Sequence, residues 1–164
     1  MEKIVSKIDS DGLSTNNEVA LDSDGSINIS ISIVTYNSAN EINGVLSSLK
    51  QSDLSGVSVK VYVVDNDSTD NTVSIIKEKY PEVIVIENKQ NMGFGAAHNV
   101  AINKASSKYH IIVNPDITFL NNTILGCVSY MEKNPDTLIL TPRTLNDNKE
   151  RSEQFLPKRR PKIK

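Results

Sequence analysis

The sequence predicts an α/β fold in which a mostly parallel sheet is flanked by helices, a Rossmann-like arrangement. Short runs rich in Ile and Val, which favour strands, alternate at least four times with segments whose apolar residues have helical spacing. This alternation is typical of parallel strands joined by right-handed helical crossovers. Polar or glycine-rich segments follow four of the expected strands. Ligands of such sheets lie at the carboxyl ends of the strands, so these four segments are candidates for a ligand site.

The same patterns place each element along the chain. Strands are expected at residues 29–35, 57–64, 83–86 and 109–113, with a fifth, short strand at 137–140. Helices are expected at residues 42–49, 70–80, 93–105 and 121–131. Ser38 or Asn40 can cap the first helix, and Ser68 or Asp70 can cap the second. Small residues in the third helix predict a tightly packed face.

The two ends of the 164-residue chain differ from its middle. Residues 1–28 form a polar extension, residues 29–142 the α/β domain and residues 143–164 a basic tail. The net charge of −2 gives no reason to expect a nucleic-acid partner. No apolar run approaches the ~20 residues of a membrane span, so we expect a cytoplasmic protein. The basic tail could bring it to the inner face of the membrane.

Polar side chains follow the first two strands. Thr35 and Asn37 can hydrogen-bond a base or its ribose, and Tyr36 between them can stack or pack. Three carboxylates in six residues follow the second strand, at Asp65, Asp67 and Asp70. A helix N-terminus accounts for one or two of them. Asp65 directly follows a buried strand, where its carboxylate can accept hydrogen bonds from a base imide or a ribose hydroxyl.

The segment after the third strand contains two glycines, Gly93 and Gly95, which permit backbone conformations closed to other residues and leave room for a ligand. Their spacing is like that of a dinucleotide loop. However, His98 stands where the third small residue of that loop belongs, and the loop does not follow the first strand, which disfavours a dehydrogenase. We expect His98 to be structural or on the surface. Asn91 and Asn99 can each hold a neighbouring loop.

The fourth strand is followed by Asn114, Pro115 and Asp116. Pro115 fixes the local backbone and keeps Asn114 extended, so Asp116 is held rigidly at a strand end. A carboxylate so placed can bind a divalent cation and leave open positions for diphosphate oxygens. A simple strand-ending turn is the alternative interpretation. We expect Asp65 and Asp116 to lie at the same edge of the sheet.

Taken together, four motifs make the chain resemble the family 2 glycosyltransferases, which have the GT-A fold. The motifs are ISIVTYN at residues 31–37, VVDNDSTD at 63–70, NMGFGAAHN at 91–99 and VNPD at 113–116. The resemblance covers about residues 29–142. The last motif is most similar to that of the rhamnosyltransferase branch, bacterial enzymes that build cell-surface polysaccharides.

The resemblance implies an inverting transfer of a sugar, rhamnose by the last motif, from a nucleotide-diphosphate donor such as dTDP-rhamnose to a glycan or lipid-linked acceptor. Asp65 would bind the base, and Asp116 would bind the Mn or Mg ion that bridges the diphosphate. The residues implied to bind the substrate are Thr35, Tyr36, Asn37, Asp65, Asp67, Asn91, Gly93, Gly95, Asn99 and Asn114. The segment from Gly93 to Asn99 would close over the sugar donor.

Two departures from the family pattern affect these expectations. The metal motif of the family often begins with Asp, whereas here it begins with Asn114, a weaker and neutral ligand. The catalytic base and most of the acceptor site of the family lie well beyond this motif. We therefore expect the base beyond Lys164, a sheet incomplete at the C-terminus, and a chain that binds the sugar donor without completing the transfer.

Two alternatives remain open on the sequence. One is a non-catalytic fragment or subunit that binds nucleotide sugars. The other is a haloacid dehalogenase-type phosphatase, because Asp65, Asp67 and Thr69 fit its D-x-D-x-T signature, with Asp65 as nucleophile. That family also needs a later acidic pair at a strand end, and none follows Val113.

Overall fold

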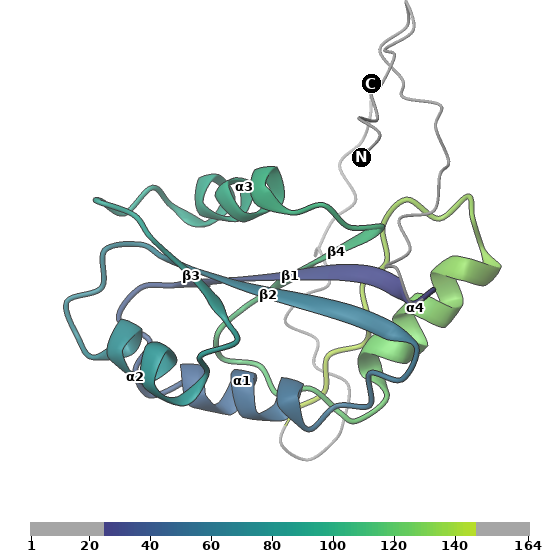
Figure 1. The fold of residues 1–164 in the computed structure, drawn as a ribbon, viewed down its shortest axis with the longest axis horizontal. Coiled ribbons are helices and arrows are strands. Elements are labelled where there is room, and N and C mark those ends of the chain that lie inside the picture. The colour runs from purple at the N-terminus through teal and green to yellow at the C-terminus, as the bar shows by residue number, and fades with distance from the viewer. Residues whose placement is uncertain (1–24, 147–164) are drawn as a thin grey trace, which may run out of the picture.

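The computed structural model describes residues 25–146, which form a parallel sheet covered by helices on both faces (Figure 1). The strands are β1 (Ile27–Thr35), β2 (Val57–Asp65), β3 (Ile84–Glu87) and β4 (Tyr109–Val113). The helices are α1 (Ile42–Lys50), α2 (Thr72–Lys79), α3 (Phe94–Lys104) and α4 (Thr123–Lys133). The expected polar extension up to residue 24 and the basic tail from residue 147 lie outside the described residues.

The predicted α/β class, its four main strands and its four helices are confirmed, with boundaries that differ by at most two residues. The predicted fifth strand is wrong. Residues 137–140 pair with no strand within residues 25–146, and the side chains of Leu138 and Ile139 are 90% and 86% exposed. A short apolar run has strand propensity, but it becomes a strand only where a neighbouring strand completes its hydrogen bonds.

Strand β1 lies inside the sheet and is buried on both faces. Its residues Ile29, Ile31 and Ile33 are fully buried against one layer of helices. The residues that this layer contributes from α1, α2 and α4 are Ile42, Val45, Leu46, Leu49, Ile76, Ile124 and Val128. Because side chains alternate between faces, Ser30, Ser32 and Val34 point to the opposite face.

Of the four described helices, α3 is the one that covers that opposite face (Figure 1). Its small residues Ala97 and Ala101 are fully buried against a second cluster that contains Val34 and Val64. The absence of large side chains at these two positions lets the helix approach the sheet closely, as the small residues predict. Within residues 25–146, no helix is both long enough and apolar enough to cross a membrane.

The sheet order is β3-β2-β1-β4, with all neighbours parallel. The register pairs Thr35 with Asp65 and Ile33 with Val113, so the carboxyl ends of β1, β2 and β4 share one edge. This confirms that Asp65 and the residues around Asp116 follow strands that end at the same edge. The chain grows from β1 to β2 and β3 on one side and returns to place β4 on the other, which makes the junction of β1 and β4 the topological switch point.

Candidate functional site

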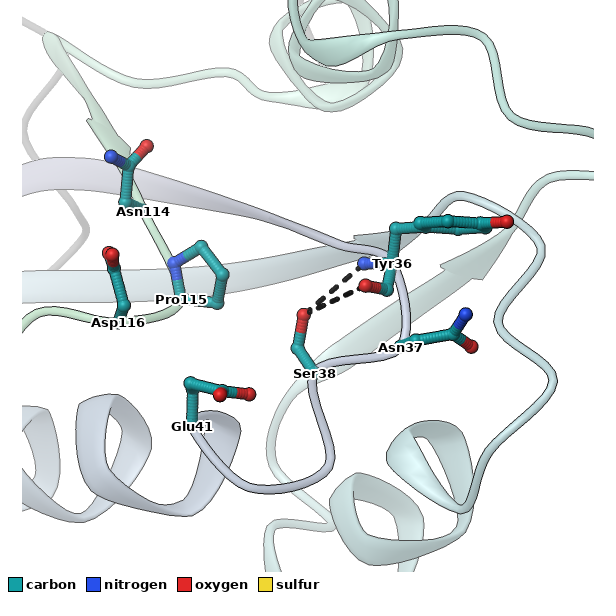
Figure 2. A pocket seen from close by; sticks show the side chains of 7 residues that line it. All are labelled: Tyr36, Asn37, Ser38, Glu41, Asn114, Pro115 and Asp116. Atoms are coloured by element: carbon teal, nitrogen blue, oxygen red, sulfur yellow. Dashed lines mark hydrogen bonds between the residues drawn. The ribbon is translucent and has the colours of Figure 1, made fainter.

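A pocket of about 370 Å³ opens at the carboxyl ends of β1 and β4, at this switch point. Figure 2 shows the residues that line it from three segments. They are Tyr36, Asn37 and Ser38 after β1, Glu41 at the start of α1, and Asn114, Pro115 and Asp116 after β4. The structure thus brings together the first and the fourth of the segments that the sequence singled out.

The pocket carries two carboxylates, Glu41 and Asp116, and among residues 25–146 no basic side chain lines it. Glu41 occupies the N-cap position of α1, yet its side chain makes no capping hydrogen bond, so its carboxylate is not bound by the helix. Asp116 is exposed, and the half-buried Asn114 adds an amide oxygen. A diphosphate would be repelled from this pocket unless a cation came with it.

The lining residues fit a divalent cation of the Mg or Mn kind, which takes oxygen ligands. Asp116, Glu41 and Asn114 are the lining side chains that carry carboxylate or amide oxygens on the side of the pocket away from the Tyr36 ring (Figure 2). In residues 25–146 no three His, Cys, Asp or Glu side chains converge as a complete ligand set.

Tyr36 supplies the apolar surface of the site. Its side chain is 53% exposed although its neighbours Thr35 and Ser38 are buried. The hydroxyl of Ser38 lies 3.3 Å from the Tyr36 amide nitrogen and 3.4 Å from its carbonyl oxygen. The backbone of Tyr36 is therefore held while its ring stays open to a planar ligand. Thr35 itself is fully buried and does not line the pocket.

Side chains of the β2–α2 loop hold the backbone just after Tyr36. The amide of Asn37 donates to Ser68 Oγ (2.8 Å), and the amide of Ser38 donates to Thr72 Oγ1 (2.9 Å). The amide of Ala39 donates to a carboxylate oxygen of Asp70 (3.1 Å). Three consecutive backbone groups are thus satisfied by one neighbouring loop, which fixes the wall of the pocket.

Two acids hold this frame together, Asp65 at the end of β2 and Asp70 in the loop. Asp65 is only 3% exposed, and its carboxylate accepts hydrogen bonds from Thr35 Oγ1 (2.9 Å), Ser68 Oγ (2.5 Å) and the Ser68 amide (2.9 Å). Burial acts to raise the pKa of Asp70, but hydrogen bonds from Thr72 and Ala39 lower it overall. Asp67 is exposed and adopts a left-handed backbone, with φ of 69°. Neither Asp65 nor Asp67 lines the pocket.

The glycine-rich segment lies at the same edge but does not line the pocket. The side-chain oxygen of Asn91 accepts the amide of Gly93 (2.9 Å) within its own loop. The same oxygen lies 3.4 Å from Asn66 Nδ2, which is the contact with a neighbouring loop that was predicted. Gly93 has φ of 79°, which confirms the need for glycine there, whereas Gly95 lies within α3 without such a conformation. Asn99 is exposed on α3.

A buried chain of hydrogen bonds runs beneath α3 and joins it to β1 and β4. Its members, in order, are the Tyr109 carbonyl, Ser107, Ser30, His110, Ser32 and His98. His98, only 2% exposed, confirms the prediction of a structural histidine. Its ring packs edge-on against Phe94, with ring centroids 4.3 Å apart.

The chain of hydrogen bonds assigns the tautomers of both histidines. Ser107 can only donate to a carbonyl, so Ser30 must donate to Ser107 and accept from Nδ1–H of His110. Nε2 of His110 is then an acceptor for the Ser32 hydroxyl, and Ser32 accepts from Nδ1–H of His98. Nε2 of His98 remains as a buried acceptor without a hydrogen-bond partner among the described residues. Burial and the neighbouring His110 lower the pKa of His98 to about 4.

Sequence reasoning missed several residues of this region. Glu41 gave no signal, because an acid at the start of a helix is expected for dipole reasons alone. The sequence predicts Ser68 only as a helix cap, whereas its hydroxyl donates to Asp65 and accepts the amide of Asn37. Asn66 is buried and receives a hydrogen bond from Asn88 (2.8 Å), while its own amide lies 3.4 Å from Asn91 Oδ1.

Comparisons with known proteins agree on one family. The model of a family described as glycosyl transferase family 2 matches residues 30–162. A poly(ribitol-phosphate) beta-glucosyltransferase of Bacillus spizizenii is 33% identical over 116 residues, which are 68% of this chain and 18% of that protein. The chain spans about a fifth of the length of the curated relatives that it matches first.

Solved structures agree with the sequence comparisons. TarS of Staphylococcus aureus, in crystal structures with UDP and with UDP-GlcNAc, matches with a TM-score of 0.60 and 27% identity, over 65% of this chain and 32% of that chain. A mannosyltransferase of Pyrobaculum calidifontis in complex with GDP-Man and Mn²⁺ matches with a TM-score of 0.59 and 25% identity, over 70% of this chain and 35% of that chain. The shared arrangement is the GT-A fold.

Proposed function

The chain belongs to glycosyltransferase family 2, and from this premise we propose that residues 25–146 build the nucleotide-sugar site of an inverting sugar transferase. The observation that carries the proposal is the pocket at the junction of β1 and β4. It combines an exposed aromatic ring at Tyr36 with a pair of carboxylates at Glu41 and Asp116. An aromatic face suits a base, and carboxylates suit the cation that accompanies a diphosphate.

The two ends of the pocket take different parts of the ligand in this proposal. Tyr36 stacks on the base, with Asn37 beside it. Asp116, helped by Glu41 and the amide oxygen of Asn114, holds the cation. A bound cation neutralises the charge that develops on the leaving diphosphate. Tyr36 and Asn37 orient the nucleotide, so that its diphosphate lies at the carboxyl-end edge of the sheet near Asp116.

The base and the sugar of the donor are a separate part of the proposal. The VNPD motif predicts dTDP-rhamnose, and this stays a prediction. The nucleotides of the TarS and mannosyltransferase structures are UDP, UDP-GlcNAc and GDP-Man, which support a nucleotide-sugar donor without favouring thymidine. We propose a uridine or thymidine diphosphate sugar, with the uridine form to be tested first.

The acceptor and the place of reaction are also proposals. The poly(ribitol-phosphate) transferases among the relatives support a cell-surface polysaccharide or its lipid-linked precursor as the acceptor. Such precursors are assembled at membranes, so we propose that the protein works in the cytoplasm at the inner face of the membrane. The basic residues that motivate membrane contact lie outside the described residues.

Calorimetric titration tests the nucleotide site. UDP, dTDP and GDP are titrated into the 164-residue chain with and without Mn²⁺, and the Asp116→Ala and Glu78→Ala variants are compared. Both variants lose one carboxylate, but Glu78 is exposed on α2, away from the pocket. We expect Mn²⁺ to tighten binding to the unaltered chain and to Glu78→Ala, and not to Asp116→Ala.

A thermal unfolding assay provides an independent reading. A nucleotide present at about 100 times its dissociation constant should stabilise the native state by ~2.7 kcal/mol if the unfolded chain does not bind it. No binding of any nucleotide in the presence of Mn²⁺ would refute the proposal. Phosphate release from an aryl phosphate would also contradict the proposal.

A further inference from the structure

We propose that Asp65, Ser68 and Asn37 form a clasp that sets the position of Tyr36 for stacking on the base, so that Asp65 is a positioning residue and does not contact the base itself. The inference rests on the proposed nucleotide site and deepens it. It also replaces the role of base ligand that the sequence suggested for Asp65. Ser68 becomes the residue through which Asp65 acts.

The first step is the state of the Asp65 carboxylate. Oxygen Oδ1 accepts from two hydroxyls, those of Thr35 at 2.9 Å and Ser68 at 2.5 Å, and Oδ2 accepts from the Ser68 amide at 2.9 Å. Three of its roughly four lone-pair directions are therefore occupied by the protein. The side chain is 3% exposed and does not line the pocket. A base in the pocket would have to displace these bonds to reach it.

The second step is the orientation of the Ser68 hydroxyl. A carboxylate can only accept, so the single hydroxyl proton of Ser68 must point to Asp65. This leaves a lone pair of Ser68 Oγ for the amide of Asn37, which donates to it at 2.8 Å. The charge of Asp65 thus selects the one orientation of Ser68 in which Asn37 is bound.

The third step is the conformation of Asn37. Its φ is 52°, in the left-handed region that few residues other than glycine adopt without cost. Its side-chain oxygen accepts from the Thr69 amide at 2.8 Å and lies 3.3 Å from Thr69 Oγ1. The backbone of Asn37 is therefore hydrogen-bonded to Ser68, and its side chain to Thr69, in the neighbouring loop.

The consequence falls on Tyr36, the residue just before Asn37. A left-handed residue turns the chain sharply, and the direction of that turn decides where the preceding side chain points. In Figure 2 the ring of Tyr36 lies at one end of the pocket and the acidic residues lie at the other. The clasp holds the ring in this place before a nucleotide arrives, so less conformational freedom is lost on binding.

The test uses Ser68, because Ser68 belongs to the clasp but does not line the pocket. Ser68→Ala removes the bond to Asn37, Ser68→Thr keeps a hydroxyl, and Ser74→Ala on the exposed surface of α2 is the matched control. Titrations of the 164-residue chain with UDP and with pyrophosphate are run in the presence of Mn²⁺. We expect Ser68→Ala to weaken UDP binding by about five- to tenfold, because without the clasp Tyr36 occupies its binding position for only a fraction of the time, and affinity falls by that fraction. Ser68→Thr should restore most of it, and pyrophosphate binding should change by less than about twofold.

A double variant tests whether Asp65 acts through Ser68. If Asp65 acts through Ser68, the double variant Asp65→Asn, Ser68→Ala should bind UDP with the same dissociation constant as whichever single variant binds UDP more weakly. Losses that multiply would mean that Asp65 acts independently of Ser68 and would overturn the inference. A loss for Ser68→Ala that Ser68→Thr does not restore, or that extends to pyrophosphate, would also overturn it, since it would indicate general distortion.

Amide hydrogen exchange examines the clasp without any ligand. Exchange at Asn37 should be about tenfold faster in Ser68→Ala than in Ser74→Ala, because the Ser68 hydroxyl protects that amide. Unchanged exchange would show that the clasp does not form in solution. Failure of the unaltered chain to bind UDP would refute the proposed function and this inference together. Binding that is insensitive to Ser68→Ala would refute the inference alone.

Discussion

The buried His98 makes the stability of this fold depend on pH between about 6.5 and 4. His98 donates through Nδ1 to Ser32, so an added proton must go to Nε2, which has no hydrogen-bond partner among the described residues. The pKa of His98 in the folded state is about 4, against about 6.5 for an unfolded chain. As the pH falls below 6.5, His98 becomes protonated in the unfolded state but stays neutral in the folded state. The stabilisation is therefore complete above about pH 6.5 and is lost as the pH falls towards 4.

The size of the loss follows from the shift. Each unit of pKa difference corresponds to ~1.4 kcal/mol, so His98 contributes a slope of up to that value per pH unit and a total of about 3 kcal/mol. Burial also lowers the pKa of His110, which adds to the slope in the same direction. The carboxylates with lowered pKa, such as Glu132 and Asp70, lose their stabilisation only below about pH 4, where carboxylates ordinarily titrate. The two effects are therefore separated along the pH axis.

Urea unfolding at several pH values between about 7 and 4.5 measures this slope. The His98→Gln variant, which cannot titrate, should be less stable at neutral pH but should show a flatter dependence on pH. Equal slopes for the unaltered chain and the variant would refute the reasoning. Nitrogen chemical shifts of the imidazole rings give a second check, because both histidines should carry their proton on Nδ1 at neutral pH.

Substitutions at four further positions have expected outcomes. Tyr36→Ala should weaken nucleoside diphosphate binding by ~1–3 kcal/mol through lost stacking, whereas Tyr36→Phe should retain most of the affinity in the same titration. Gly93→Ala should cost about 1–2 kcal/mol of unfolding free energy, because φ is 79° and no atom lies within 4 Å of the new Cβ, so backbone strain alone acts. Gly44→Ala, on the exposed surface of helix α1 with equal space, should stabilise by ~0.5–1 kcal/mol. Ile33→Ala, at a fully buried position of β1, should cost ~2–5 kcal/mol in urea unfolding.

The sheet and the edge that carries the site could be predicted from the sequence because their signals are local. Runs of β-branched residues mark each strand, and the residue that follows a strand is at its carboxyl end whatever the rest of the chain does. Pro115 likewise marks the end of β4 from its own chemistry. These features require no knowledge of which segments touch.

The parts that could not be predicted depend on contacts between distant segments. The alternation of Ile and Ser in β1 reads as a strand with one exposed face, yet Ser30 and Ser32 are buried because two distant histidines bind them. Asp65 reads as a free carboxylate until the positions of Thr35 and Ser68 are known. Residues 137–140 have the propensity of a strand but no partner in the described part of the chain.

The position of β4 also has a consequence for how the pocket forms and opens. The contact of Ser32 with His110 joins residues 78 positions apart, whereas that of Thr35 with Asp65 spans only 30. We therefore expect strands β1 to β3 to assemble first from nearer contacts, and β4, a five-residue strand at the edge of the described sheet, to dock onto them later. The pocket lies across the junction between β1 and β4. A nucleotide with its cation would contact the segments after both β1 and β4. Partial unfolding that releases β4 would therefore require the ligand to leave first.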